Sequence, residues 1–170
     1  MQQKTRKLVL AGIFIALGLV LPIAFHGVGM AGNIFLPMHI PVLLCGILCG
    51  YQLGGIVGLL IPLLSSLFFG MPPMYPIAIY MACELIAYGV VAGLLVKKTK
   101  IIIALLGAML AGRVALGLAQ MLLLGFGSEG FSWQIFLTGA FVTALPGIIL
   151  QLVLIPLLLT GLKRANLRIS

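Results

Sequence analysis

The sequence predicts an all-α integral membrane bundle of six transmembrane helices, and three observations lead to this prediction. Hydrophobic residues make up 63% of the 170-residue chain and charged residues only 7%, whereas a soluble domain carries about 25% charged residues. Mean hydropathy is +1.33. Nearly all of the ten basic residues fall into three short clusters between long apolar stretches. Because a helix needs roughly 20 residues to cross the hydrocarbon, we expect a single membrane-embedded domain over residues 1–170 and no separate soluble domain.

The first three predicted spans cover residues 8–24, 36–50 and 54–69. The first follows a basic start, as a signal peptide would, but it is long and no A-x-A-like site clearly ends it, so we interpret it as a membrane helix. A Gly-rich loop over 26–35 follows it. The next two spans are short and broken by prolines, with a turn expected at Tyr51-Gln52-Leu53. Irregular backbone at membrane depth needs cover from protein or a wet cavity, so the 26–35 loop is expected to dip into the mouth of the bundle.

The last three predicted spans cover residues 75–96, 101–124 and 133–162. A turn rich in proline at 70–74 precedes the first of them, and a basic segment separates it from the second. A Gly-rich loop at 125–132 precedes the last. An even number of spans places both termini on one side of the membrane, and every basic cluster then falls on that side.

This distribution of charge predicts that both termini are cytoplasmic, because positive residues concentrate in cytoplasmic loops. The clusters are Lys4, Arg6 and Lys7; Lys97, Lys98 and Lys100; and Lys163, Arg164 and Arg168. The net charge of +8 is better matched by anionic lipid headgroups than by nucleic acid, because the clusters flank apolar spans and form no basic face. We therefore expect a multi-pass protein of the plasma membrane.

Small residues recur at a spacing of four along several spans. They are Gly46, Gly50, Gly54 and Gly58; Gly89 and Gly93; Ala104, Ala108 and Gly112; and Gly12 with Ala16. Such residues share one helix face and let backbones approach closely. We expect most of them to pack within the bundle, and we single out Gly12 and Ala16 as a face that could dock a partner membrane protein.

Two opposite charges lie inside the predicted spans, Glu84 in the fourth and Arg113 in the fifth. A charge within the bilayer is costly and usually functional. The two residues either form a buried ion pair that fixes helix register or face a ligand, and both readings stay open. Polar residues at helical spacing share a face with each charge: Tyr80 and Tyr88 with Glu84, and Gln120 with Arg113.

Further candidates for a substrate site lie toward the outer mouth: Asn33, His39 and Thr138. Tyrosines and threonines also serve as interfacial anchors or bond to their own backbone, so that alternative is kept. No His pair has metal spacing and Asp is absent, which predicts no metal site. Cys45, Cys49 and Cys83 are expected to pack in apolar surroundings. No nucleotide-binding motif is evident, so we expect no cofactor on this chain.

The run LPMHIPVLLCGILCGYQLGGIVGLLIPLLSSLFFGMPP, followed by YPIAIYMACELIAYGVVAGLL, resembles the substrate-binding (S) components of energy-coupling factor vitamin transporters. The resemblance extends over residues 8–162 and is most specific over 36–95. Gly12-x-x-x-Ala16 stands where many members carry an Ala-x-x-x-Ala docking motif, with Gly replacing the first Ala.

The resemblance implies a six-helix protein that binds a water-soluble vitamin from outside and topples in the membrane to carry it inward. Its partners would be a transmembrane coupling subunit and two cytoplasmic ATPases, which use the ATP. The family's pocket is built from the loop after helix one and from helices four to six, which here implies residues 26–35, Tyr80, Glu84, Arg113, Gln120 and the outer half of the sixth span.

Two other classes of function are compatible with composition and charge alone. A channel would usually need rings of like polar groups. An intramembrane enzyme would need a nucleophile, an acid and a base within reach, and only Glu84 is a good candidate base. Among substrates, Arg113 favours an anionic vitamin such as pantothenate. If Glu84 neutralises Arg113, a neutral ring such as pyridoxine or a pyrimidine becomes as plausible.

Overall fold

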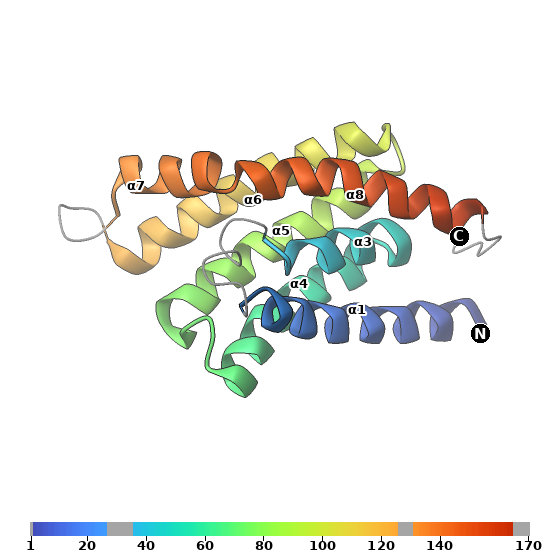
Figure 1. Cartoon of the computed structure of the whole chain (residues 1–170), viewed down its shortest axis with the longest axis horizontal. Coiled ribbons are helices and arrows are strands. Elements are labelled where there is room, and N and C mark those ends of the chain that lie inside the picture. Colours follow the sequence, from blue (N-terminus) through green and yellow to red (C-terminus); the bar gives the residue numbers. More distant parts are fainter. Residues whose placement is uncertain (1, 27–35, 126–130, 165–170) are drawn as a thin grey trace.

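The computed structural model describes residues 2–26, 36–125 and 131–164, and within them the chain is a bundle of helices (Figure 1). The elements in chain order are α1 (Gln2–His26), α3 (His39–Cys49), α4 (Tyr51–Phe69), the π-helix η1 (Met74–Ala78), α5 (Ile79–Leu95), α6 (Ile101–Leu124), α7 (Trp133–Leu137), the π-helix η2 (Thr138–Thr143) and α8 (Leu145–Arg164). Counting η1 with α5, and α7 and η2 with α8, gives the six helical segments that the sequence predicts. The fifth has the predicted bounds.

Five of the six segments are long and apolar enough to cross a membrane. The exception is α3, with 11 residues. At 1.5 Å per residue it is about 16 Å long, roughly half of the hydrocarbon thickness. The predicted span over 36–50, which we expected to be short, is thus a helix that begins at His39 and ends at Cys49. The preceding loop, which we expected to dip into the bundle, lies outside the described residues, as does Asn33.

The predicted turn at Tyr51-Gln52-Leu53 is wrong, because these residues form the first turn of α4. The reversal between α3 and α4 is made by Gly50 alone, at φ +101°, a left-handed region that favours glycine. Gly50 therefore belongs to a turn and not to a packing face. The Lys97 ammonium lies 5.9 Å from the centre of the Tyr51 ring, so this turn lies beside a basic cluster even though it contains no basic residue itself.

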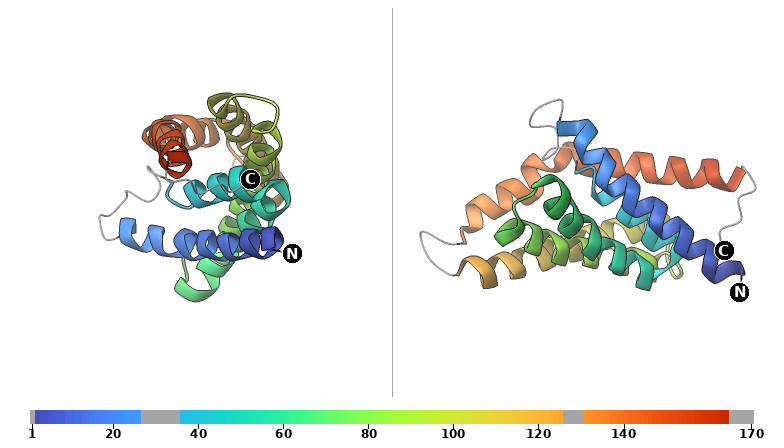
Figure 2. Two further views of the ribbon diagram at one scale, coloured as in Figure 1. Left: turned by 90° about the vertical axis from the view of Figure 1, so that its right-hand side faces the viewer. Right: turned by 90° about the horizontal axis from the view of Figure 1, so that it is seen from below.

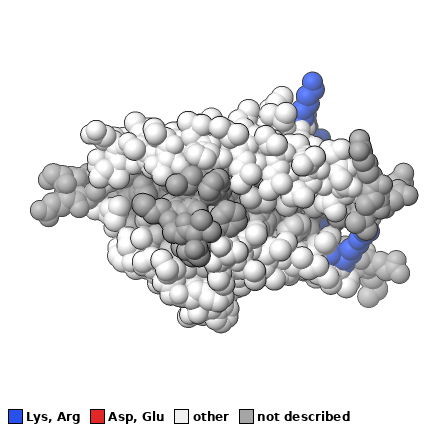
Figure 3. All heavy atoms as spheres, in the orientation of Figure 1, with Lys and Arg blue, Asp and Glu red and all other residues white. Residues whose placement is uncertain are grey.

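The start of α1 and the end of α8 lie at the same end of the bundle (Figures 1 and 2). In the space-filling view, the basic side chains that are visible lie toward that end (Figure 3). Over the rest of this face, the described residues show no charged side chain.

Helices α3, α4 and α5 pack backbone against backbone at the predicted glycines. A Cβ at Gly46 would meet the Gly89 carbonyl oxygen, and one at Gly54 would lie 2.6 Å from the Cα of Gly46. A Cβ at Gly58 would lie 2.5 Å from the carbonyl carbon of Leu85. No side chain fits at these contacts, which confirms intramolecular packing for these glycines.

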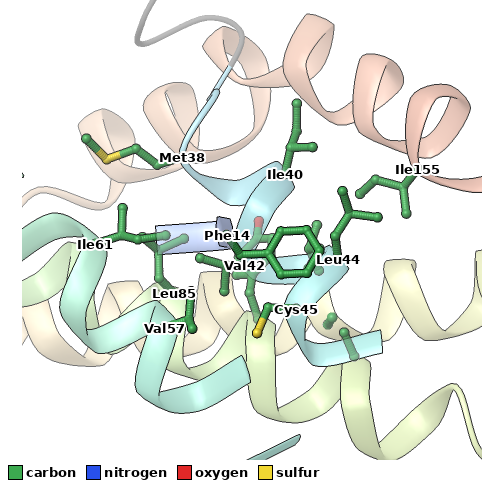
Figure 4. Packing of buried hydrophobic residues seen from close by; sticks show 14 of the residues in the cluster. Phe14, Met38, Ile40, Val42, Leu44, Cys45, Val57, Ile61, Leu85 and Ile155 are labelled. Carbon is green, nitrogen blue, oxygen red and sulfur yellow. The ribbon is translucent and has the colours of Figure 1, made fainter. Parts of the chain in front are cut away.

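The hydrophobic core surrounds these contacts (Figure 4). Val42, Leu43 and Cys45 of α3 are fully buried at its centre, and α1 and α8 contribute Phe14 and Ile155 from the two sides. Cys45 and Cys49 are buried free thiols, whereas Cys83 is exposed. The short α3 is therefore enclosed by longer helices, which explains why it can begin deep in the bundle.

Substituting alanine at two glycines is expected to affect stability differently. A Cβ at Gly89 would meet the Gly54 backbone, while one at Gly161 would meet nothing within 4 Å. Gly89→Ala should lower stability by about 1–3 kcal/mol through overpacking. Gly161→Ala should leave it unchanged or raise it, because alanine favours the helix. Thermal unfolding of the purified protein in detergent measures both, and equal midpoints for the two variants would contradict the packing described here.

Candidate functional site

A cavity of about 690 Å³ lies between the start of α3, the α4–η1 connection, α5, α6 and the α7–η2 segment. This volume is within the range of small-molecule sites, about 300–1,000 Å³. Most of the lining is apolar, including Met38, Met81 and Phe136, and the polar groups are few. A pocket of this kind holds a small organic molecule by shape and orients it with a small number of hydrogen bonds.

Glu84 of α5 and Arg113 of α6 form an ion pair in the lining of this cavity. The Arg113 Nη1 donates to the Glu84 Oε1 at 2.7 Å, and the two residues are 5% and 3% exposed. Glu84 and Arg113 therefore form a buried ion pair and also line a cavity, so a structural role and a ligand-facing role are compatible. The pair lets each charge stay buried, because an isolated charge in an apolar interior is strongly unfavourable.

His39 joins the pair from α3. Its Nε2 lies 3.5 Å from the Glu84 Oε1, and the residue is 1% exposed and lines the cavity. Neither ring nitrogen has a hydrogen-bond partner among the described residues. From the sequence we expected His39 toward the outer mouth. In the structure it lies beside the same carboxylate as Arg113.

Tyr88 lies behind His39 and does not line the cavity. Its ring packs edge-on against the imidazole, with centroids 4.8 Å apart, and the residue is fully buried. A Cβ at Gly112 of α6 would overlap the Tyr88 ring, so this small residue makes the space that the ring occupies. Tyr88 therefore supports His39. The sequence predicted Tyr88 as a residue of the substrate site, but its side chain does not line the cavity.

Arg113 keeps two unused donors. Its Nε and Nη2 are buried and have no hydrogen-bond partner within the described segments. A buried donor without a partner costs about 1–3 kcal/mol. Because Arg113 lines the cavity, a ligand acceptor such as a carboxylate or carbonyl would remove this cost, and guanidinium geometry suits a planar group with two oxygens.

Tyr80 and Gln120 extend the polar strip along the cavity wall. Tyr80 lies one helical turn before Glu84 on α5, and Gln120 lies two turns after Arg113 on α6. The two side chains are close enough to interact across the helices. Tyr80 and Glu84 of α5 and Arg113 and Gln120 of α6 thus line the cavity, whereas Tyr88 of the predicted α5 face does not.

Thr138 does not line the cavity. It is exposed, and its hydroxyl donates to the Gln134 carbonyl of its own helix at 2.7 Å. Thr143 lines the cavity instead. Phe136, Ala140 and Thr143 line the cavity at spacings of three and four residues. Such residues share one helix face, and Thr138 lies on another face.

The apolar residues that line the cavity could not be identified from the sequence. Met38, Met81, Phe131 and Phe136 line the cavity, but in a chain that is apolar throughout, a residue that faces a cavity and one that faces lipid look alike. The proline pair Pro72-Pro73 also borders the cavity, and the sequence identified it only as a turn.

A family model for the substrate-specific component of ECF transporters matches residues 6–159. The chain belongs to this family. Comparison with curated proteins and with solved structures finds no match. The protein is therefore a multi-pass membrane S component that captures substrate for an energy-coupling factor transporter, and it is a transporter component and not an enzyme. Membership implies an energy-coupling module with ATPases as its partner.

The S component leaves the predicted docking face on α1 open. Gly12 and Ala16 are both exposed, and a Cβ at Gly12 would meet nothing within 4 Å. By contrast, Gly18 on the same helix packs against Ile61 of α4. Gly12 and Ala16 therefore lie on the outer face of α1, where another membrane protein could approach the backbone.

A double-mutant cycle tests whether Glu84 and Arg113 depend on each other in the S component. Glu84→Gln or Arg113→Met alone leaves a buried charge without its partner, which typically costs about 3–5 kcal/mol. The double variant should recover much of this loss, because no buried charge remains. Thermal unfolding in detergent gives the comparison. A double variant as unstable as the two single losses combined would show that the residues act independently.

Proposed function

We propose that this S component captures a water-soluble vitamin or a related micronutrient from outside the cell and delivers it across the membrane. The observation that carries this proposal is the cavity lined by Glu84 and Arg113, in which buried Arg113 donors lack partners among the described residues. A stand-alone transporter or channel is the alternative, and a requirement of uptake for the ATPase partners separates it from the proposal.

The proposed orientation has the basic end in the cytoplasm, with both termini there, as the positive-inside rule favours. The Lys97–Lys100 segment, the α3–α4 turn, the start of α1 and the end of α8 share one end of the bundle. The cavity borders the opposite loops, at Pro72-Pro73 and at Phe131-Ser132. It would then accept ligand from the exterior of the plasma membrane.

The proposed ligand carries one polar end and a less polar body. Arg113 retains a free edge that suits a carboxylate, which favours pantothenate. The Glu84 partner makes the pair neutral, which favours a neutral ring such as pyridoxine or a pyrimidine, with Tyr80 available for stacking. His39, Glu84, Arg113, Tyr80 and Gln120 are the proposed contacts, and Tyr88 is proposed to act through His39.

Replacing Arg113 tests the site directly. Arg113→Ala should weaken ligand binding by more than tenfold, a loss of about 1.4 kcal/mol or more, because the ligand loses its charge-assisted hydrogen bonds. Native mass spectrometry of the purified protein first identifies the retained small molecule, and titration calorimetry with that molecule then gives the affinity. Thr138→Ala, on a threonine outside the cavity, is the matched control. Unchanged affinity in Arg113→Ala would leave Arg113 with a purely structural role.

The α1 face is proposed to dock the transmembrane coupling subunit, which is joined to two cytoplasmic ATPases. Gly12→Trp and Ala16→Trp should block close approach of a partner helix and reduce co-purification of the coupling subunit by about tenfold. Leu17→Trp is the control, because Leu17 is exposed on a different side of α1. Equal recovery with all three variants would place the docking surface elsewhere.

A further inference from the structure

A second, smaller hollow lies on the outside of the bundle between α6 and the α7–η2 segment. Its volume is about 190 Å³, and its lining is apolar except for Arg113. On the α6 side it is bordered by Leu110, Val114 and Leu118, which are 62%, 56% and 57% exposed. On the other side lie Trp133, Phe136 and Phe141. We call this hollow the α6–η2 groove.

We propose that the acyl chain of a bilayer lipid occupies the α6–η2 groove. The groove is continuous with the exposed apolar stripe of α6, which is one of the membrane spans. From Leu110 to Met121 it follows α6 for about 16 Å at 1.5 Å per residue. One leaflet of the hydrocarbon core is about 15 Å thick. The length and the apolar lining therefore match a single acyl chain of one leaflet.

The groove and the cavity share a wall. Arg113 and Phe136 line both. The Phe136 ring lies on the backbone of Gly117, where an added Cβ would be 3.1 Å from its Cζ. It is also part of an aromatic cluster with Phe131, at 5.7 Å between centroids, and Trp133, at 6.0 Å. The acyl chain and the cavity ligand thus contact opposite sides of one aromatic partition, and the lipid holds that partition in place.

The groove is separate from the proposed docking face. Helix α1, with Gly12 and Ala16, lies on the opposite side of the bundle from α7 (Figures 1 and 2). The coupling subunit would therefore not cover the α6–η2 groove, and the proposal for the groove stands or fails independently of the proposed transport function.

The experiment uses tryptophan substitutions along the exposed stripe of α6. Val114→Trp and Leu118→Trp fill the groove from the lipid side and do not touch the cavity. Leu106→Trp and Leu122→Trp lie on the same stripe beyond the two ends of the groove, and both positions are exposed. The full chain is reconstituted in vesicles of palmitoyl-oleoyl phosphatidylcholine, released into mild detergent and analysed by native mass spectrometry.

The wild-type protein should retain one phosphatidylcholine per chain. Each groove variant should retain about tenfold less, while the two flanking variants should match the wild type. Having two groove variants protects the test against one that does not fold. Lipid retention that is equal in all four variants, or a wild-type protein that retains no lipid, would overturn the proposal. A retained second copy of the chain that is lost in the groove variants would also overturn it, because it would identify a protein as the occupant.

Discussion

The carboxylate of Glu84 ties three helices of the bundle to one point. Its Oε1 accepts a hydrogen bond from Arg113 of α6 and lies 3.5 Å from the imidazole of His39 at the start of α3. An unpaired carboxylate in an apolar interior would carry a large desolvation cost, so Arg113 must face Glu84 and α6 cannot rotate freely against α5. Arg113 also lines the cavity, as Glu84 does. Helix register and the charged part of the cavity wall therefore come from one ion pair.

The close packing of α3, α4 and α5 makes this arrangement possible. Gly46, Gly54 and Gly89 bring three backbones into contact, and the single-residue reversal at Gly50 returns the chain directly into α4. Because α3 is short and enclosed, its first residue, His39, lies deep in the bundle and not at the membrane surface. A longer second helix would move His39 away from Glu84. The small residues thus set the depth of the polar site as well as the packing of the helices.

The sequence was sufficient for features that depend on composition and on lone charges. The bounds of α6 and the meeting of Glu84 with Arg113 were predictable, because apolar length defines spans and two opposite buried charges have no other partner in this part of the chain. The positions of the residues at the outer mouth were not predictable from the sequence. The length of α3 depends on tertiary enclosure. In the apolar segment 133–162, the sequence does not show whether the face of Thr138 or that of Thr143 turns toward the cavity. Apolar cavity walls and lipid-facing surfaces also have the same composition.

The distribution of rigid and open surfaces bears on how such a protein could move its substrate. Helices α3, α4 and α5 are joined by backbone contacts that leave no room for sliding, and the polar end of the cavity is built on α3 and α5. The exposed Gly12–Ala16 face belongs to α1, which packs on α3 and α4. A partner that tilts α1 would therefore tilt the polar site with it. This coupling favours movement of α1, α3, α4 and α5 as one body.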